Sequence, residues 1–220
     1  MGLNFLGEVN FPMFKIKQWP LLLVSVLGYL TILPAFSGFV TPAYSQDFVR
    51  VIPSLGKGPY EVIMFADYFC PPCRRIDMKA ESLLKVLLAT QQVKITFIDV
   101  PFNRATPVYA KYYLYAVNAD PGMNHVFHVR KTLFNAAQDK RIQEEGALAA
   151  YLKEQQIVWK AMNEKAVFPL MSAVIKENKV DATPTCIIKY STADVKKYIG
   201  GDEIWDGLTK FKTYLASVKK

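Results

Sequence analysis

The chain has 220 residues, 51% of them hydrophobic and 21% charged, which suits one globular domain with a substantial core. Its three cysteines are too few, and odd in number, for the multi-disulfide framework of small secreted proteins. The formal net charge is +8, but the lysines and arginines are scattered and form no stripe beside a recognisable nucleic-acid-binding module. We therefore expect a solvated basic surface and no nucleic-acid partner, with weak attraction to anionic membranes as a further use of the charge.

Residues 1–45 are predicted to be a targeting segment. Lys15 and Lys17 form a basic flank, and the apolar run 21–33 that follows has the length of a signal-peptide core. Small residues at suitable spacing permit cleavage after Ser37 or after Ser45. The sequence therefore favours a signal peptide that is removed on export.

The same segment permits a second interpretation, an uncleaved membrane anchor, because the uncharged run 20–45 is long enough to span a bilayer. The translation start is open between Met1 and Met13, since a well-formed basic flank begins at Met13. Both interpretations place the rest of the chain in the periplasm or another exported, oxidising compartment.

The first half of the folded region predicts a strand, a helix and a strand. A short strand is expected at 48–52, before a loop punctuated by glycine and proline. An apolar strand at 60–65 leads into a helix at 70–91 with one apolar face, and a second apolar strand follows at 93–100. Strand, helix and strand of these lengths form a βαβ unit with parallel strands.

The middle of the chain is predicted to be helical. Thr106 and Pro107 form a helix opening, with the threonine as N-cap and the proline at the first helical position. Helices are expected at 108–119, 124–138 and 142–154.

The C-terminal part predicts a helix at 168–177, a hairpin of strands 185–190 and Val195–Ile199, and a last helix opened by Gly200-Gly201-Asp202. The apolar face expected for the last helix consists of Ile204, Leu208, Phe211, Leu215 and Val218. The order of elements is thus βαβ, a helical insertion, and ββα.

The candidate for chemistry is Cys70-Pro71-Pro72-Cys73, at the predicted start of the helix 70–91. Unpaired backbone N–H groups and the helix dipole favour negative charge at a helix N-terminus. A thiolate is negative, so Cys70 is predicted to be an acidic and reactive thiol. A permanent structural disulfide and half of a zinc site are the alternatives for the pair.

Residues 58–75, which include the two cysteines, and the later Ala182-Thr183-Pro184-Thr185 resemble the DsbA-like group of the thioredoxin superfamily. The resemblance runs from residue 48 to residue 218. It implies an α/β fold (an α+β sandwich), the thioredoxin fold with a central mixed sheet and an inserted helical domain. The implied division is a first half at 46–104, the helical insertion at 105–166, and a second half at 167–220.

The resemblance also assigns roles to the motif residues. Cys70 would be the nucleophile that forms a mixed disulfide with a substrate, and Cys73, one helical turn deeper, would resolve it. Thr183 and Pro184 would be joined by a cis peptide bond and would bind an extended substrate beside Cys70 by strand addition.

Further positions in and before the motif bear on its reactivity. Pro71 and Pro72 lack N–H groups and so remove hydrogen-bond donors that could reach the Cys70 sulfur. Many relatives keep a buried acid six residues before the first cysteine, where this chain has Met64, so the route by which Cys73 is deprotonated is open. Asp67 is expected to order the loop before Cys70 rather than to relay protons, and Glu61 is the other nearby acid in the sequence.

Most of the remaining candidate residues are expected to have structural rather than chemical roles. Cys186 on an apolar strand is expected to fill the core as a small hydrophobe. His125 and His128 fall inside the insertion, and we expect no metal site formed by them with the two motif cysteines. Either Arg74 or Arg75 could lower the pKa of Cys70 by through-space attraction. The aromatic residues expected to pack within the helices are Tyr112, Tyr113, Tyr115, Phe127 and Phe134.

The sequence therefore predicts an exported thiol-disulfide oxidoreductase that needs no cofactor and acts as a monomer. Its expected partners are cysteine-containing exported proteins and a redox partner that resets the dithiol, with residues 20–45 as a possible membrane tether. Oxidase, isomerase and reductase are all compatible with the motif. The alternatives are a redox-inert, peptide-binding thioredoxin-like domain with a structural disulfide, and a thiol metal carrier.

Overall fold

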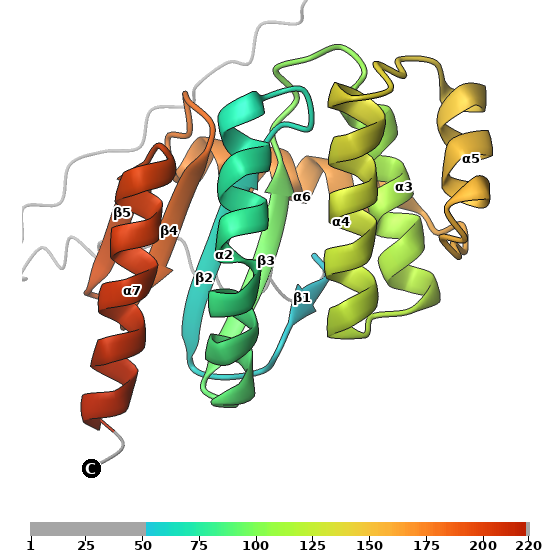
Figure 1. Cartoon of the computed structure of the whole chain (residues 1–220). Coiled ribbons are helices and arrows are strands. Elements are labelled where there is room, and N and C mark those ends of the chain that lie inside the picture. Colours follow the sequence, from blue (N-terminus) through green and yellow to red (C-terminus); the bar gives the residue numbers. More distant parts are fainter. Residues whose placement is uncertain (1–51, 219–220) are drawn as a thin grey trace, which may run out of the picture. The chain divides into compact units, whose positions relative to one another are not determined.

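The computed structural model describes residues 52–218, which contain a five-stranded mixed sheet in the order β1-β3-β2-β4-β5 (Figure 1). The predicted targeting segment 1–45 and its two cleavage positions lie outside the described residues. Within residues 52–218, no helix combines the length and the apolar character needed to cross a membrane.

The centre of the sheet is a βαβ unit. The strands β2 (Tyr60–Ala66) and β3 (Val93–Asp99) are parallel, with Val62 opposite Ile95, and α2 (Pro71–Ala89) connects them. Nearly every side chain of the two strands is buried, because elements cover both faces of the sheet. The predicted βαβ unit is therefore confirmed.

The second half adds a hairpin on the other side of β2. The strand β4 (Thr185–Lys189) pairs antiparallel with β2, and β5 (Val195–Ile199) pairs antiparallel with β4 as the sheet edge. At the opposite edge, β1 (Ser54–Leu55) pairs antiparallel with β3. The strand expected at 48–52 is wrong at its described end, because Ile52 lies before the strand and the pairing with β3 starts at Ser54.

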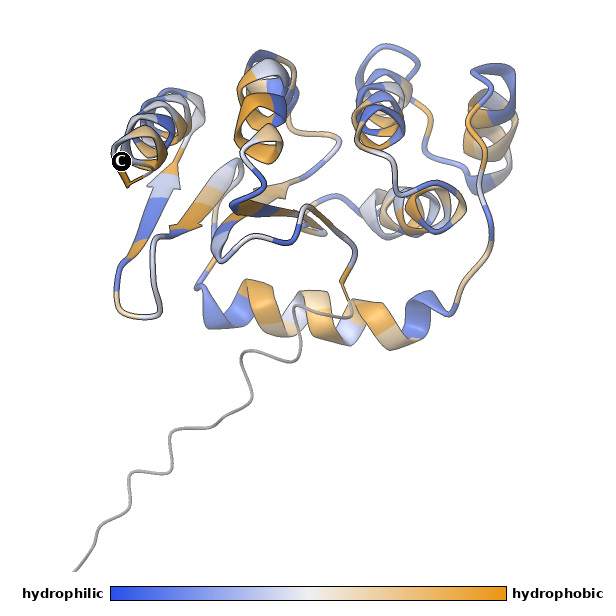
Figure 2. Ribbon diagram, turned by 90° about the horizontal axis from the view of Figure 1, so that it is seen from below, coloured by the Kyte–Doolittle hydropathy of each residue, from blue (hydrophilic) through white to orange (hydrophobic). Residues whose placement is uncertain are grey.

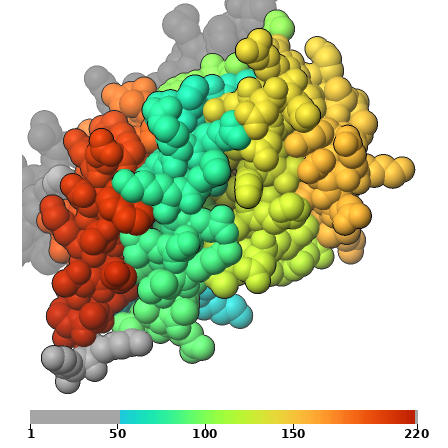
Figure 3. Space-filling model, viewed as in Figure 1, coloured from blue at the N-terminus to red at the C-terminus, as the bar shows by residue number. Residues whose placement is uncertain are grey.

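Helices lie on both sides of the sheet. Figure 2 shows α2 and α7 (Gly201–Val218) end-on at one side of the sheet and α6 (Glu164–Glu177), seen from its side, at the other. In Figure 3, α2 lies between α7 and α4 (Met123–Gln138) on the same face of the molecule. The helix α4 packs against α2 and α3 (Thr106–Ala119), and α5 (Glu145–Glu154) packs against α4. The fold predicted from the sequence, a thioredoxin fold with helices inserted between its halves, is confirmed.

Several element boundaries differ from the prediction for physical reasons. Thr106 is the first residue of α3 and not its N-cap, because its hydroxyl donates instead to the Asp67 carboxylate at 3.0 Å. The helix α5 begins at Glu145 rather than at Ile142, whose N–H bonds to the Ala136 carbonyl after the last turn of α4. The helix α6 begins four residues earlier than expected, at Glu164, and contains Pro169.

The core is formed by the sheet and the inward faces of the helices. In α7 the predicted apolar residues Ile204, Leu208, Phe211 and Leu215 are buried, whereas Val218 is 46% exposed at the helix end. The largest apolar side chains of the sheet, among them Phe65 and Phe97, are fully buried. Each such side chain stabilises the fold by about 1.5–3 kcal/mol relative to an exposed position. The strand β2 ends at the loop that leads to Cys70 and the start of α2.

Candidate active site

The cysteine pair lies where β2 ends and α2 begins. Cys70 is the N-cap of α2, with an extended backbone, and its Sγ accepts a hydrogen bond from the Cys73 N–H at 3.2 Å. The two cysteines form a disulfide, with their Cα atoms 5.3 Å apart. Cys70 is half-buried, whereas Cys73 is completely buried. Only Cys70 is therefore accessible to another protein.

Two exposed prolines separate the cysteines and occupy the first positions of α2. Neither Pro71 nor Pro72 has an N–H group, so Cys73 supplies the first backbone donor that can reach the Cys70 sulfur. A thiolate formed at Cys70 would keep this hydrogen bond and would also lie at the positive end of the helix dipole. The local sequence thus stabilises a negative sulfur through one amide and the helix.

The predicted substrate-binding loop lies next to the disulfide. The Thr183–Pro184 peptide bond is cis, as the resemblance implied, and the Thr183 carbonyl oxygen is 3.6 Å from Cys70 Sγ. The Thr185 hydroxyl donates to the Ala182 carbonyl at 2.8 Å, and the Gly200 N–H donates to the Pro184 carbonyl at 2.9 Å. Within residues 52–218, Thr183 makes no backbone hydrogen bond to another residue, so its N–H and C=O are available to a ligand.

Asp67 fixes the loop that precedes Cys70. Its buried carboxylate accepts from the Phe69 N–H at 2.7 Å, from the Asn103 N–H at 2.8 Å and from the Thr106 hydroxyl at 3.0 Å. These bonds join the loop after β2 to the segment after β3. They fit the loop-ordering role predicted for Asp67.

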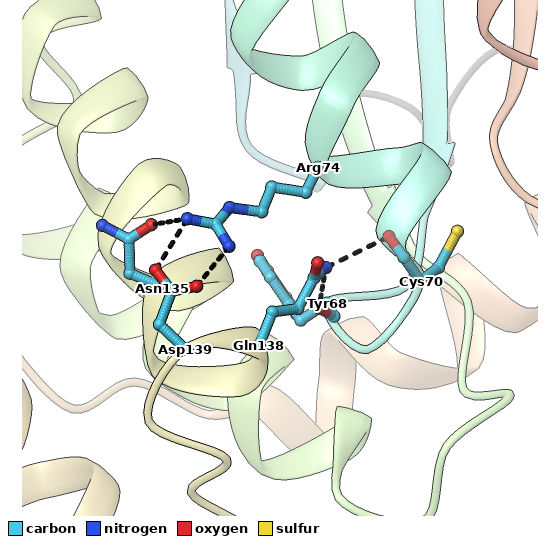
Figure 4. A network of polar contacts seen from close by, with 6 residues as sticks. All are labelled: Tyr68, Cys70, Arg74, Asn135, Gln138 and Asp139. Carbon is cyan, nitrogen blue, oxygen red and sulfur yellow. Dashed lines mark hydrogen bonds and ion pairs between the residues drawn. The ribbon is translucent and has the colours of Figure 1, made fainter.

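The last turn of α4 also holds the cysteine loop, which the sequence did not indicate (Figure 4). The Gln138 side-chain amide donates to the Tyr68 carbonyl at 2.8 Å and to the Cys70 carbonyl at 3.1 Å. Arg74 donates to both carboxylate oxygens of Asp139, at 2.6 and 2.7 Å, and to the side-chain oxygen of Asn135 at 2.9 Å.

These contacts distinguish the two arginines that follow the motif. The hydrogen bonds to Asp139 raise the pKa of Arg74, and the charge of Arg74 is largely balanced by that carboxylate. Arg75 is exposed and makes no ion pair within the described part of the chain. Of the two, only Arg75 brings an uncompensated positive charge to this surface.

A buried group of charged side chains lies near the end of the sheet that leads to Cys70. Arg130 of α4 is 1% exposed and donates to Asp77 Oδ1 from Nε at 2.8 Å and from Nη2 at 2.6 Å. Its Nη1 is 3.9 Å from Asp99 Oδ1, and its guanidinium stacks 4.0 Å above the centre of the Phe97 ring. Asp77 follows Cys73 by four residues on the buried face of α2, so the two side chains point the same way.

Asp99 is the one acid of this group without a full set of partners. It is opposite Ala66 at the cysteine-bearing end of β2, and neither carboxylate oxygen has a hydrogen-bond partner among the described residues. Burial raises its pKa to about 7, although the neighbouring Arg130 opposes this effect. Burial likewise raises the pKa of Asp77, again against Arg130. Apart from Asp67 in the loop before Cys70, the buried acids near the cysteines are thus on α2 and β3, while position 64 on β2 is a buried methionine.

The other candidate residues have structural surroundings. Glu61, at the far end of β2, forms ion pairs with Lys94 and Lys189, so it does not belong to the cysteine site. Cys186 is completely buried opposite Met64, and burial raises the pKa of its thiol. Both observations agree with a structural role for each residue.

The histidines and aromatic residues of the insertion lie either in the packed interior of the helices or at the protein surface. His125 is half-buried and His128 is exposed on α4. Among residues 52–218, no group of three or more His, Cys, Asp or Glu side chains is arranged to hold a metal ion. The aromatic residues that are buried as expected are Tyr112, Tyr113, Phe127 and Phe134. Tyr115 is half-buried and donates its hydroxyl to Glu164 at 2.9 Å.

Comparisons with known proteins agree with the fold. The sequence matches the family model described as thioredoxin over residues 56–199. A comparison with curated protein sequences finds no significant match. The structure is similar to α-DsbA1 of Wolbachia pipientis, with a TM-score of 0.58, 15% identity, and coverage of 79% of this chain and 99% of that one.

Two other solved structures give similar agreement. A periplasmic thioredoxin-like protein from Salmonella enterica serovar Typhimurium has a TM-score of 0.54 and 17% identity, with 73% of this chain and 88% of that chain covered. BdbD from Bacillus subtilis, in its oxidised form, has a TM-score of 0.51 and 22% identity, with 74% and 93% covered. At these identities the likeness shows a common fold.

Proposed function

The chain belongs to the thioredoxin family, and from this membership we propose that it is a thiol-disulfide oxidoreductase that exchanges disulfides with other proteins. The observation that carries the proposal is the arrangement of the cysteine pair. Cys70 is accessible at the N-terminus of a helix, Cys73 is buried beneath it, and the Thr183 carbonyl is 3.6 Å from the accessible sulfur. An inert structural disulfide would need neither the accessible cysteine nor the unpaired backbone beside it.

The proposed reaction begins with a substrate strand that pairs with the free backbone groups of Thr183. In the oxidising direction, a substrate thiolate attacks Cys70 Sγ, the Cys70–Cys73 bond breaks, and Cys73 leaves as a thiolate. A second substrate thiolate then attacks the substrate sulfur of the mixed disulfide and releases Cys70 as a thiolate. The substrate has lost two electrons and the enzyme has gained them.

The reducing direction follows the same steps in reverse, and Cys73 resolves the mixed disulfide. In both directions the buried Cys73 changes between disulfide and thiolate or thiol, so a proton must reach or leave the protein interior. The redox potential of the pair decides among oxidase, isomerase and reductase activity.

We further propose an exported location and protein partners. The basic flank and apolar run within residues 1–45 support export, by signal cleavage or with 20–45 retained as a tether. One structural relative, the thioredoxin-like protein from Salmonella enterica, is periplasmic, which supports this location. The substrates would be cysteine-containing exported proteins, and a second redox protein would return the monomeric enzyme to its starting state.

The proposal is tested by trapping. Cys73→Ser removes the resolving thiol, so Cys70 should retain its partners as mixed disulfides that a reductant releases. The matched control is the Cys70→Ser, Cys73→Ser double variant, which should retain none. If the single variant traps no exported protein and Cys70 alkylates with the pH dependence of an ordinary thiol, the proposal is wrong and the redox-inert alternative holds. Equilibration of the wild-type dithiol with glutathione buffers then gives the direction of exchange.

A further inference from the structure

A pocket of about 250 Å³ lies beside the cysteine pair, between the first turns of α2 and α7. Pro72 of the motif is part of its wall, and the buried side chain of Ile76 supplies an apolar base beside Gly201. The rest of the lining consists of the charged residues Arg75, Lys79 and Asp202. This volume is below the roughly 300–1,000 Å³ of sites for drug-sized ligands, and it suits a single side chain.

The charge of this pocket is positive. Arg75 and Lys79 are both exposed, and in the described part of the chain neither forms an ion pair. Lys79 Nζ is 4.6 Å from the centre of the Trp205 ring, so a cation-π contact holds the ammonium group near the pocket. Asp202 is the only acidic residue of the lining. Two positive charges therefore face one negative charge.

The pocket lies next to the segment that would receive a substrate. The Gly200 N–H donates to the Pro184 carbonyl, and α7 starts at the next residue, so the cis-proline loop leads directly to the pocket wall. In an extended peptide, side chains on one face are about 6.5–7 Å apart. A peptide with its cysteine sulfur at Cys70 would have neighbouring side chains on the side of the pocket, because the motif residue Pro72 forms part of the pocket wall.

We propose that this pocket is a subsite for an acidic side chain, so that the protein prefers substrate cysteines with Asp or Glu within two residues. The inference rests on the proposed function, because it names the class of polypeptide that the same dithiol would accept. A carboxylate in the pocket would meet Arg75 and Lys79 over an apolar base that the carbon atoms of Asp or Glu can cover. The neighbouring Arg74 could not serve in their place, because Asp139 already pairs with it.

The test measures reaction rates with short capped peptides. Each peptide carries one cysteine as a mixed disulfide with thionitrobenzoate and has Glu, Gln or Lys at one of the four flanking positions. In the reduced full-length protein, the Cys70 thiolate attacks the peptide sulfur and coloured thionitrobenzoate leaves. Cys73 then displaces the peptide thiolate and closes the disulfide, so the protein loses two electrons and the probe gains them.

For at least one position, the Glu peptide should react about two- to tenfold faster than its Gln counterpart, the range expected for one or two surface ion pairs. The Lys peptide should be the slowest, and the preference should vanish near 1 M salt, where the screening length is about 3 Å. The ratio between peptides is the readout, because a change at Arg75 also alters the general reactivity of Cys70.

The Arg75→Gln, Lys79→Gln double variant should bring the Glu-to-Gln ratio to about one. The matched control, Lys131→Gln with Lys210→Gln, removes the same charge at exposed positions outside the pocket and should keep the preference. Asp202→Asn should increase the preference. Equal rates for all peptides, or a preference that survives the double variant, would overturn the subsite and leave the exchange function intact. A failure of every peptide to react would instead count against the exchange function itself.

Discussion

Replacement of Arg130 by methionine tests the buried charge group beneath the cysteine pair. The change removes two charge-assisted hydrogen bonds to Asp77 and leaves the carboxyl groups of Asp77 and Asp99 buried without a cation. Breaking a buried pair in this way costs about 3–5 kcal/mol. The cost of leaving one carboxylate unpaired cannot exceed the cost of protonating it. At pH 7 that protonation costs on the order of 1.4 kcal/mol for each pH unit above the usual pKa of the carboxyl group, or about 4 kcal/mol.

The pH dependence distinguishes this mechanism from a simple loss of packing. Without Arg130 the buried carboxyl groups bind protons more tightly in the folded protein than in the unfolded chain. The destabilisation should therefore be small near pH 4–5 and grow towards pH 8, by on the order of 1 kcal/mol per pH unit while a carboxyl group titrates. Urea unfolding of the oxidised protein, followed by tryptophan fluorescence at several pH values, measures the difference.

Two further variants complete the experiment. Arg130→Met combined with Asp77→Leu should be less destabilised than Arg130→Met alone, because one of the unpaired acids is gone. The exposed Arg104, replaced by methionine, is the control and should change the free energy of unfolding by less than about 0.5 kcal/mol. A loss for Arg130→Met below about 1 kcal/mol, or one that is equal at pH 5 and pH 8, would refute the reasoning.

Three other predictions use the same protein. Because burial raises the pKa of Asp99 to about 7, the folded state binds its proton more tightly than the unfolded chain does. The contribution of Asp99 to stability should therefore fall as pH rises from about 4 to 7, and the difference in the free energy of unfolding between wild type and Asp99→Asn should change with pH accordingly in urea titrations. Gln138→Leu removes donors to two carbonyls and should cost about 1–3 kcal/mol and speed amide hydrogen exchange at Cys70 and its neighbours, whereas Asp139→Asn, which leaves those bonds in place, should not change exchange there. Cys186→Ala should leave the count of two exchangeable thiols unchanged by mass spectrometry, and a loss of exchange in that variant would contradict a structural role.

The sequence predicted the features that depend on neighbouring residues. The strand before Cys70, the helix after it and the hairpin of the second half all follow from local periodicity and turn residues, and the structure confirms them. The cis bond before Pro184 followed from the resemblance rather than from the periodicity. The strands, the helix and the hairpin could be predicted because each is encoded within a short stretch of chain.

The features that were missed join residues far apart in the sequence. The Gln138 side chain donates to the carbonyl of Tyr68, which is 70 residues earlier in the chain, and to that of Cys70, 68 residues earlier. Arg130 donates to Asp77, which is 53 residues earlier. Periodicity places such residues on a helix face but does not say what that face meets. A signal was present in the charges, since Asp77 lies among the apolar positions of α2 and Arg130 lies on the buried side of α4. Thr106 was predicted to be an N-cap because its hydrogen bond to Asp67, which is distant in the sequence, could not be foreseen.

Because α4 is bonded to the loop before Cys70, the helices of the insertion should differ in how well they tolerate amino-acid substitutions. A single carboxamide at position 138 touches two backbone carbonyls next to the disulfide, so a shift of the last turn of α4 moves the groups around Cys70. The helix α5 packs against α4 and has no bond to that loop among the described residues. In a library of random substitutions, tolerance should therefore be lowest at the end of α4 and rise through the exposed positions of α5, although both belong to the same insertion.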